Sequence, residues 1–268
     1  MQKKYETLAR KTKRFLEEAV QRSYIPLFEV NRRFLSDFDL HMRTVEKLKN
    51  NAVTKNMQQL RHLIRVCLQN EWMEKDPFVN YPLKLNETDR GYLTFAEVTT
   101  IQNIALPSKR LEQTRDVFIF CCYTGLAYAD VVKLNRLNVE IFSNGIEWIK
   151  IHRTKTKTRS IVPILPISKM ILERYYEFSR TNNEHRLLPV ISNQNLNKYL
   201  KEVATICGIE KRISVHLARH TFATTITLEK GVDIVTVSRM MGHKKLSTTQ
   251  IYSKVTELKI AEDMKKLL

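Results

Sequence analysis

Apolar and charged residues alternate at helical spacing through the first part of the chain. Three segments repeat an apolar residue every three or four positions, which is typical of amphipathic helices, and they are residues 4–21, 31–49 and 54–74. Asn31 and Thr54 begin two of these segments and have side chains suited to cap a helix. The pattern therefore predicts a helical domain over residues 1–76.

The pattern changes in the rest of the chain. Residues 77–92 are polar and punctuated by proline, which predicts a linker, and Thr94 is a suitable cap for the helix that follows. Helical spacing then alternates with short segments rich in β-branched residues, which predicts a helical domain with a small sheet over residues 93–268. Asn144-Gly145 predicts a hairpin turn between the first two strands. The expected strands are residues 139–142, 146–152 and 160–165, and the expected helices are residues 95–106, 111–123, 127–134, 169–179, 193–207, 216–230, 234–241 and 258–267.

Composition indicates a polyanionic partner. Lysine and arginine total 45 against 28 for aspartate and glutamate, a formal net charge of +17, and such an excess is typical of proteins that bind nucleic acid. An acidic membrane surface or a ribosome-like partner is the alternative. No apolar segment approaches the about 20 residues that cross a bilayer, and the polar N-terminus lacks the apolar core of a signal peptide. We therefore expect a bacterial cytoplasmic, nucleoid-associated protein with no membrane partner.

Several kinds of catalytic site are missing from the sequence. Acidic residues are scattered instead of clustered as two-metal nucleases require. No glycine-rich phosphate loop, GxSxG elbow or HExxH motif occurs, and the 6 glycines leave little room for such a loop. The 4 cysteines show no metal-binding spacing. We therefore expect neither a metal ion nor a cofactor.

What remains is a set of basic and hydroxyl side chains near the C-terminal end. His216 and Arg219 are three positions apart, so a helix places them on one face near its start, where an arginine fork and the helix N-terminus favour a phosphate. Gly242 and His243 fit a helix end, and Tyr252 follows nine residues later. Taken singly, these elements are weak, because a solvated helix face and a packed tyrosine are the ordinary explanations.

Together, the elements occur in one order and at one spacing: His216-x-x-Arg219, then Gly242-His243, then Tyr252. This arrangement resembles the C-terminal signature of the tyrosine recombinases, also called the phage integrase family. The resemblance covers nearly the whole chain. It implies a SAM-like helical core-binding domain over residues 1–76 and, over residues 93–268, a mainly α-helical catalytic domain with a small antiparallel β-sheet. Many members carry a further N-terminal arm-binding domain that this sequence lacks, so the sequence resembles either a simpler recombinase or a shortened form of a longer one.

The resemblance implies a role for each of these side chains. Tyr252 attacks the scissile phosphate of DNA and forms a 3′-phosphotyrosyl link, which conserves the bond energy and needs no ATP. Arg219 binds the non-bridging oxygens, and His243 donates a further hydrogen bond to the phosphate. His216 accepts or positions the proton of the tyrosine. Arginines thereby replace the metal ions of other DNA-cutting enzymes.

The family also places a lysine on a β-hairpin, where it protonates the departing 5′-oxygen. The segment from His152 to Pro163 resembles this hairpin, and Lys155, eight residues before Pro163, fits the family spacing best. Lys157 is the alternative acid. A further alternative is that the cations of this segment only grip phosphates in a DNA groove, and these cations are Arg153, Lys155, Lys157 and Arg159.

One position departs from the family. A first catalytic arginine usually follows Thr-Gly-Leu, but Ala127 stands there in this chain. Arg115, twelve residues upstream, is the candidate replacement, because its sequence Arg-Asp-x-Phe-x-Phe resembles that of integrases of conjugative transposons. Over twelve residues of helix, positions 115 and 127 differ in direction by about 120°, which makes the replacement plausible. Alternatively, Arg115 pairs with Asp116 or Glu112 on a surface. Without a replacement, the chain is a catalytically impaired DNA-binding or architectural relative.

The resemblance also implies the partners. The two domains clamp duplex DNA at a recombination site. A monomer in solution forms a homo-tetramer on paired DNA sites, the last helix is donated to a neighbouring protomer, and accessory DNA-bending proteins assist. The expected function is site-specific recombination that integrates or excises a mobile element, with type IB topoisomerase-like relaxation of DNA as an alternative. The expected DNA contacts are Arg10, Lys13, Lys55, Lys157, Arg159, Lys244 and Lys245.

Overall fold

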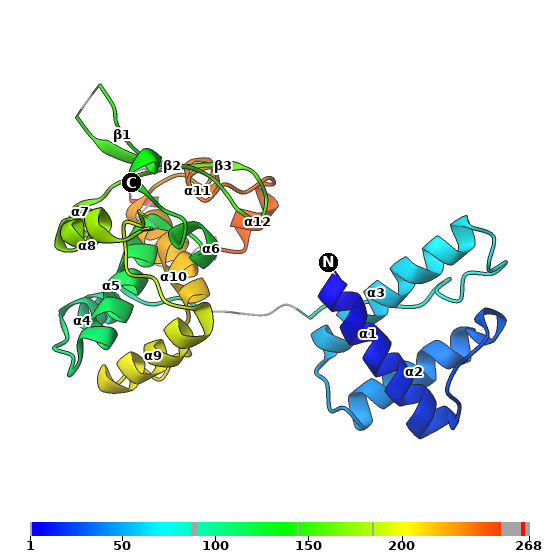
Figure 1. The fold of residues 1–268 in the computed structure, drawn as a ribbon. Helices are drawn as coiled ribbons and strands as arrows, with labels where there is room; N and C mark the ends of the chain where they lie inside the picture. Colours follow the sequence, from blue (N-terminus) through cyan, green and yellow to red (C-terminus); the bar gives the residue numbers. More distant parts are fainter. Residues whose placement is uncertain (1, 87–90, 144, 184, 253–263, 266–268) are drawn as a thin grey trace. The chain divides into compact units, whose positions relative to one another are not determined.

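The computed structural model of the chain divides into two compact units, Met1–Asp89 and Arg90–Leu268 (Figure 1). The structure describes residues 2–86, 91–143, 145–183, 185–252 and 264–265. Each unit is built around a buried apolar core of its own. The described residues form helices and one small antiparallel sheet, which confirms the fold class predicted from the sequence.

Three α-helices build the first unit: α1 (Gln2–Phe15), α2 (Arg32–Thr44) and α3 (Asn50–Gln69). A π-helical turn, η1 (Leu16–Val20), extends α1, and a 3₁₀ turn, η2 (Leu27–Glu29), precedes α2. Each helix buries one apolar face, as amphipathic spacing predicts. Phe15 is fully packed between the helices, where its ring contacts the rings of Phe34 and Phe38.

The two caps expected in this unit have different outcomes. The Asn31 side chain accepts a hydrogen bond from the Phe34 amide and caps α2, as predicted. The prediction that Thr54 begins a helix is wrong, because α3 begins at Asn50. Thr54 is buried, and its hydroxyl donates to the Lys84 carbonyl at 3.2 Å, which ties α3 to the segment that follows it.

The first part of the expected linker, residues 77–92, belongs to the first unit. Phe78 is 1% exposed in the core of the first unit, and the Asn86 amide donates to the Asn51 side chain on α3. The first unit therefore extends past residue 76, because the proline-containing segment packs on the helices instead of running free. Leu93 is fully buried in the second unit, where the second domain was expected to begin.

A buried helix, α5 (Lys109–Thr124), organises the second unit. It packs against α4 (Phe95–Asn103), α7 (Pro166–Arg174), α9 (Asn193–Ile206) and α10 (Val215–Thr221). Thr94 caps α4 in a capping box with Glu97, as predicted. The shorter helical elements are α6 (Tyr128–Val131), η3 (Arg136–Asn138), α8 (Tyr176–Thr181), α11 (Ile234–Met240) and α12 (Ser247–Gln250).

Two helices approach closely where α5 ends. Gly125 caps α5 with a φ of +65°, and a Cβ at this position would lie 2.4 Å from the Phe222 ring, so the approach requires glycine. Phe222 begins a π-helical stretch, η4 (Phe222–Thr227), which continues α10 and leads into η5 (Leu228–Lys230). The helix predicted over residues 216–230 is thus one helical path with a widened middle, and it passes beside the Gly125 carbonyl.

The sheet has the order β1 (Val139–Ile141), β2 (Glu147–His152), β3 (Arg159–Pro163), with both pairings antiparallel. Val139 pairs with Ile149, and His152 pairs with Arg159, so the strands lie where the sequence pattern predicts them. The loop between β2 and β3, residues 153–158, folds back on itself. β3 packs against α11, so this loop lies beside the end of α11 (Figure 1).

The C-terminal part of the chain is described to Tyr252 and again at Met264 and Lys265. The rest of the helix expected over residues 258–267, and its donation to a neighbouring protomer, lie outside the described residues. Among the described helices, none is long and apolar enough to cross a membrane.

Candidate active site

Arg219 is the centre of the candidate site. Its side chain is 4% exposed on α10, a helix whose first turn is capped by the Ser214 hydroxyl. One terminal nitrogen, Nη1, donates to the Gly125 carbonyl at the end of α5. The other, Nη2, donates to the Met241 carbonyl at the end of α11. Arg219 therefore joins the ends of two helices that are far apart in the sequence.

His243 lies against the same guanidinium. Its Nε2 is 3.0 Å from Nη2 of Arg219, and its Nδ1 is 2.7 Å from the Thr249 hydroxyl. Because Nη2 can only donate, Nε2 accepts, and the proton of the neutral ring belongs on Nδ1. Burial first, and then the positive charges of Arg219 and Arg153, lower the pKa of His243 to about 4. The ring is therefore neutral at pH 7.

Tyr252 packs against two histidines at this point. Its side chain is buried, its ring meets the His220 ring edge-on with centroids 4.8 Å apart, and it stacks on His243 at 6.2 Å. The structure therefore brings together Arg219, His243 and Tyr252, three residues that the sequence motif singled out.

His216 is connected to this group through a second histidine. It is exposed on α10, and its Nε2 is 3.3 Å from Nε2 of His220, one helical turn further along. His220 is buried, and its ring contacts both the His216 ring and the Tyr252 ring. The motif did not single out His220. Its four-residue spacing from His216, which puts both on one helix face, is the sequence signal that identifies it.

A second arginine, Arg153, reaches the site from the loop between β2 and β3. Its Nη1 is 3.3 Å from the Met241 carbonyl, the same acceptor that Arg219 uses. Its Nε is 3.4 Å from Oδ2 of Asp130. Burial first, and then Arg153, lower the pKa of Arg219 to about 10, while Tyr252 and Asp130 oppose the shift. Arg219 therefore stays charged at pH 7 although it lies close to a second cation.

Further contacts dock this loop on α6 and on the end of α11. The Thr154 amide donates to Oδ1 of Asp130 at 2.8 Å, and the Thr158 hydroxyl donates to the Gly242 carbonyl at 2.6 Å. Gly242 has a φ of +60°, and a Cβ on it would lie 2.7 Å from Cδ of Arg153. The sequence marks Arg153 as one of four cations in the hairpin, but no local pattern distinguishes it from the other three.

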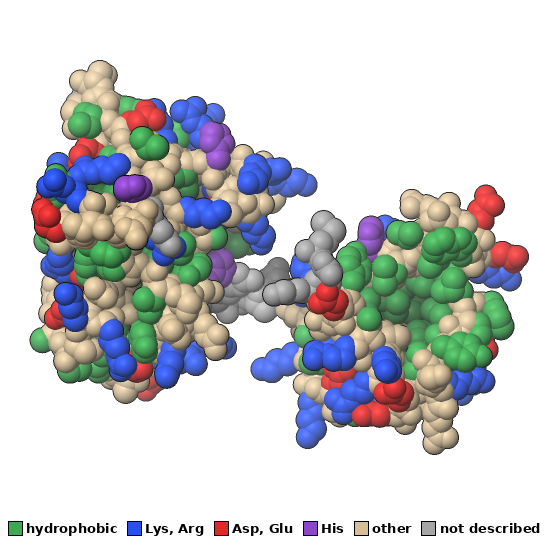
Figure 2. All heavy atoms as spheres, in the orientation of Figure 1, with side chains coloured by type: hydrophobic (Ala, Val, Ile, Leu, Met, Phe, Trp, Pro, Cys, Tyr) green, Lys and Arg blue, Asp and Glu red, His purple; other side chains and the backbone are tan. Residues whose placement is uncertain are grey.

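The other cations expected in this unit to contact DNA are on the surface. They are Lys155, Lys157, Arg159, Lys244 and Lys245, and all are exposed. Lys155 and Lys157 follow Arg153 in the β2–β3 loop, and Lys244 and Lys245 directly follow His243 in the sequence. Lys and Arg side chains are spread over the visible faces of both units, with acidic side chains between them (Figure 2). The described contacts thus link Arg153, and not Lys155, to the buried group around Arg219.

In the first unit, the residues expected to contact DNA are also exposed, and they are Arg10, Lys13 and Lys55. Arg10 and Lys13 lie on α1, where Nζ of Lys13 is 3.7 Å from the Glu17 carboxylate. Lys55 lies in the second turn of α3, not at its start. An exposed ion pair such as that of Lys13 contributes little to stability and leaves the cation available to a phosphate.

Arg115 lies away from this group. Its Nε is 2.9 Å from Oδ1 of Asp116, and its Nη1 donates to the Ile104 carbonyl at 2.9 Å. It precedes Gly125, whose carbonyl binds Arg219, by ten residues, which is about 15 Å along the helix axis. The described contacts therefore place Arg115 outside this group and do not support the prediction that it replaces the missing arginine. The helical rotation allowed it, but the rise along α5 separates the two positions.

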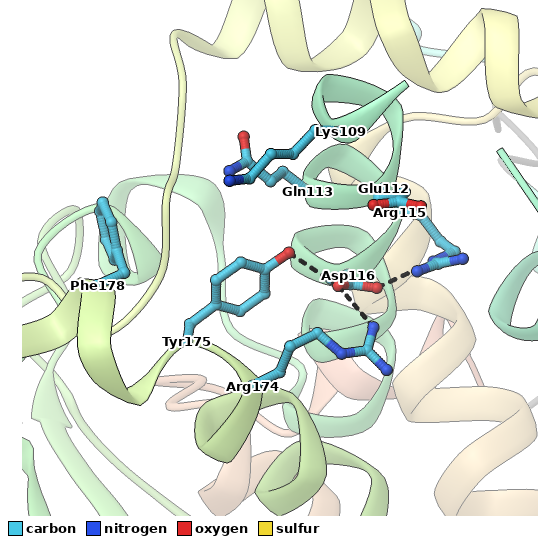
Figure 3. A pocket seen from close by; sticks show the side chains of 8 residues that line it. All are labelled: Lys109, Glu112, Gln113, Arg115, Asp116, Arg174, Tyr175 and Phe178. Atoms are coloured by element: carbon cyan, nitrogen blue, oxygen red, sulfur yellow. Dashed lines mark hydrogen bonds and ion pairs between the residues drawn. The ribbon is translucent and has the colours of Figure 1, made fainter. Parts of the chain in front are cut away.

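The alternative, a pair between Arg115 and Asp116, is what the structure shows, although the pair is buried and not on a surface. Asp116 also accepts hydrogen bonds from Nη1 of Arg174 and from the Tyr175 hydroxyl, both at 2.8 Å, and the three donors point towards it in Figure 3. Burial, and then Asp116, raise the pKa of Tyr175. A cavity of 570 Å³ adjoins the group and is lined by Lys109, Glu112, Gln113, Arg115, Asp116, Arg174, Tyr175 and Phe178. Asp116 thus fastens α7 to α5.

No candidate metal site is found in the part of the chain that the structure describes, since no three His, Cys, Asp or Glu side chains meet there.

Two family descriptions match the sequence: "Phage integrase family" over residues 91–259 and "Phage integrase SAM-like domain" over residues 1–83. A tyrosine recombinase XerD of Listeria innocua is 33% identical over 226 residues, which cover 79% of this chain and 74% of that protein. A tyrosine recombinase of Pseudothermotoga lettingae is 27% identical over 250 residues, which cover 91% and 85%.

Solved structures share the fold. The XerH recombinase bound to its palindromic difH substrate matches with a TM-score of 0.75 and 17% identity, over 97% of this chain and 78% of that one. The integrase of transposon Tn1549 in complex with a circular intermediate DNA matches with a TM-score of 0.72 and 16% identity, over 98% and 93%. The family description that matches residues 91–259, with the 33% identity to the Listeria innocua recombinase, shows that the chain belongs to the phage integrase family, the tyrosine recombinases.

Proposed function

We propose that this protein is a site-specific DNA recombinase that cuts and rejoins duplex DNA through a covalent link to Tyr252. The observation that supports this most is the convergence of Tyr252 and His243 on the buried guanidinium of Arg219. A tyrosine beside a buried cation and a neutral imidazole is suited to attack a phosphate, because the cation stabilises the charge that develops on the phosphate oxygens.

In the proposed reaction, the Tyr252 oxygen loses its proton and attacks the scissile phosphorus. The bond between phosphorus and the 5′-oxygen breaks as the 3′-phosphotyrosyl bond forms, so one phosphodiester replaces another without ATP. His216 accepts the proton of the tyrosine, and His220, in contact with both rings, positions the two. Attack by a 5′-hydroxyl on the phosphotyrosyl bond then rejoins the strand.

Arg219 and His243 bind the phosphate in this proposal. The phosphate oxygens take over the Arg219 donors that bind the Gly125 and Met241 carbonyls, because a charged acceptor forms the stronger hydrogen bond. Nε2 of His243 then no longer accepts from Arg219 and can carry a proton to donate. A bound phosphate therefore raises the pKa of His243 from about 4.

The departing 5′-oxygen needs a proton, and we assign the role of proton donor to Lys155. Lys155 is exposed two residues after Arg153, whose side chain reaches the Met241 carbonyl beside Arg219, and this short separation supports the assignment. Lys157 in the same loop is the alternative donor.

The proposed substrate is duplex DNA at the recombination site of a mobile element, with integration or excision as the outcome. The Tn1549 integrase and XerH structures each contain DNA, and the net charge of +17 suits the same partner. The proposed assembly is a monomer that forms a homo-tetramer on paired sites with accessory DNA-bending proteins. The exposed cations of both units contact the phosphates.

Covalent trapping tests this function. The full chain is incubated with a pool of nicked duplexes that have randomised cores, and adducts that survive SDS are isolated and sequenced. We expect an adduct with the wild-type chain and none with Tyr252→Phe, which keeps the ring and loses the nucleophile. DNA binding without an adduct would instead support a DNA-binding or architectural relative, the alternative raised by Ala127. Relaxation of supercoiled plasmid without sequence preference would support a topoisomerase.

A further inference from the structure

The position after Leu126 is where the family usually has a phosphate-binding arginine, and Ala127 offers no side-chain donor. We propose that Arg153, from the loop between β2 and β3, supplies the second guanidinium of the phosphate site. This proposal rests on the proposed recombinase function and adds a catalytic residue to it.

The first support is a shared acceptor. Nη1 of Arg153 and Nη2 of Arg219 both donate to the Met241 carbonyl. Two guanidinium groups that converge on one oxygen atom are also placed to converge on the oxygens of one phosphate. A phosphate is the better acceptor for both, because it carries a full negative charge and a carbonyl does not.

The second support is the way in which Arg153 is held. Oδ2 of Asp130 lies 3.4 Å from its Nε, and Oδ1 of Asp130 accepts the Thr154 amide at 2.8 Å. Asp130 thus fixes the start of the loop and one edge of the guanidinium, while the other edge points to Met241. Asp130 lies on α6, three residues after Ala127. The guanidinium of Arg153 therefore lies beside α6, which begins one residue after Ala127, the position where the family usually has its arginine.

The third support is the space that Gly242 leaves. A Cβ at Gly242 would lie 2.7 Å from Cδ and 3.2 Å from Cγ of Arg153. The aliphatic part of Arg153 therefore passes directly over the glycine that precedes His243. At this position, glycine permits both the positive φ of the turn and the path of the arginine.

Electrostatics agree with this geometry. The charge of Arg153 is one of the causes that lower the pKa of Arg219 to about 10 and the pKa of His243 to about 4. The guanidinium groups of Arg153 and Arg219 are therefore close enough to repel each other, and the carboxylate of Asp130 offsets part of this repulsion. An incoming phosphate relieves this repulsion, and such preorganised positive charge favours the transition state.

In the reaction, Arg153 forms and breaks no covalent bond and exchanges no proton. It donates hydrogen bonds to the non-bridging oxygens while the Tyr252 oxygen bonds to phosphorus and the 5′-oxygen leaves with a proton from Lys155. Arg219 and Arg153 then stabilise the same charge from two sides.

The first test compares rates of adduct formation on a nicked duplex selected by trapping with the wild-type chain. We expect Arg153→Ala to lower the rate by about 10²- to 10³-fold, the loss typical of one preorganised donor. Arg153→Lys keeps the charge and should retain part of the rate. Arg115→Ala is the matched control, since it removes an arginine that also pairs with a buried aspartate and is 12% exposed against 11% for Arg153. We expect its rate to stay within a few-fold of the wild type.

Modified phosphates separate a catalytic role from a structural one. A methylphosphonate at the scissile position has no charge on its non-bridging oxygen, so the deficit of Arg153→Ala should shrink by about tenfold or more. A residue that only holds the loop would give the same deficit on both substrates. A 5′-bridging phosphorothiolate, whose sulfur leaves without a proton, should rescue Lys155→Ala and not Arg153→Ala.

The two proposals fail in distinguishable ways. If the wild-type chain forms no Tyr252-dependent adduct, the recombinase function itself is overturned. If the wild-type chain forms the adduct and folded Arg153→Ala matches it, or if its deficit is unchanged on methylphosphonate, only the role of Arg153 is overturned. Circular dichroism establishes that each variant is folded, and Arg153→Lys on both substrates supplies the comparison if Arg153→Ala is not.

Discussion

Two arginines of this chain are alike in burial and pairing, yet they lie in different surroundings. Arg115 and Arg153 have side chains that are 12% and 11% exposed, and they pair with Asp116 and Asp130. Asp116 binds two further donors and fastens one helix to another. Arg153 extends past Asp130 to the carbonyl that it shares with Arg219. Burial and an ion pair are therefore common to both arginines, and the further contacts of each arginine or its aspartate partner distinguish a structural role from a place in the site.

The largest expected effect concerns the structural member of this comparison. Asp116→Ala removes the carboxylate that Arg115, Arg174 and Tyr175 share. Loss of one partner from a buried ion pair costs about 3–5 kcal/mol. We expect the free energy of unfolding to fall by about 3 kcal/mol, the lower end, because the Arg174 side chain is 47% exposed and can turn to solvent. Urea denaturation followed by circular dichroism measures the change. A cleavage rate lowered as strongly as in Arg153→Ala, in protein that is still folded, would place the Asp116 group in catalysis.

The next effect concerns the carboxylate that positions Arg153. Asp130→Asn keeps an oxygen for the Thr154 amide and loses the charge that faces Nε of Arg153. Because a displacement of about 1 Å can cost about 10²-fold in rate, we expect cleavage of the selected duplex to fall by about that factor. The double variant Asp130→Asn/Arg153→Ala should be no slower than Arg153→Ala alone, since both changes act through one guanidinium. Additive losses would show that Asp130 acts independently of Arg153.

A smaller effect tests whether the guanidinium can be supplied from the family position. In an Arg153→Ala background, Ala127→Arg places a guanidinium at the start of α6, three residues before Asp130. We expect cleavage to recover by about tenfold and not completely, because no contact in the fold preorganises the new side chain. Ala127→Gln is the control, as it is long and uncharged. Equal recovery with glutamine would mean that positive charge at this position is not what the site lacks.

The sequence predicts those parts of the site whose signals are local. The Thr94 capping box and the three strands follow from patterns within a few residues of each element. The motif that contains Arg219, His243 and Tyr252 names side chains that the structure brings together. Their convergence rests on the close approach of helix ends, which short glycine turns make possible.

The misses depend on contacts between distant positions. Thr54 has a side chain suited to cap a helix, but its hydroxyl instead donates a hydrogen bond to the Lys84 carbonyl, 30 residues away. Arg115 satisfies the rotation of a helix, whereas the rise along the helix decides which groups it can reach. Arg153 meets the Met241 carbonyl across 88 residues. No local pattern records such a pairing, so a loop cation that enters a site resembles its exposed neighbours in the sequence.

The smallest effect that we expect distinguishes the two arginines without DNA. The charge of Arg153 lowers the pKa of His243 together with burial and Arg219, which come first, and the charge of Arg115 is not among the causes. Arg153→Ala should therefore raise the pKa of His243 from about 4 part of the way towards 6.5, and Arg115→Ala should leave it unchanged. NMR titration of the imidazole protons measures both shifts.

The same shift predicts a dependence of stability on pH. The folded-state pKa of His243 lies below its ordinary value, so between pH 6.5 and pH 4 the unfolded chain binds more protons at this group. Its contribution to stability is therefore present above pH 6.5 and is lost as the pH falls through this window. Arg153→Ala should weaken this loss, and Arg115→Ala should preserve it, as thermal unfolding at several pH values would show. Equal changes in both variants would mean that the arginines act on His243 through overall charge, and the contrast between the two pairs would then reflect packing alone.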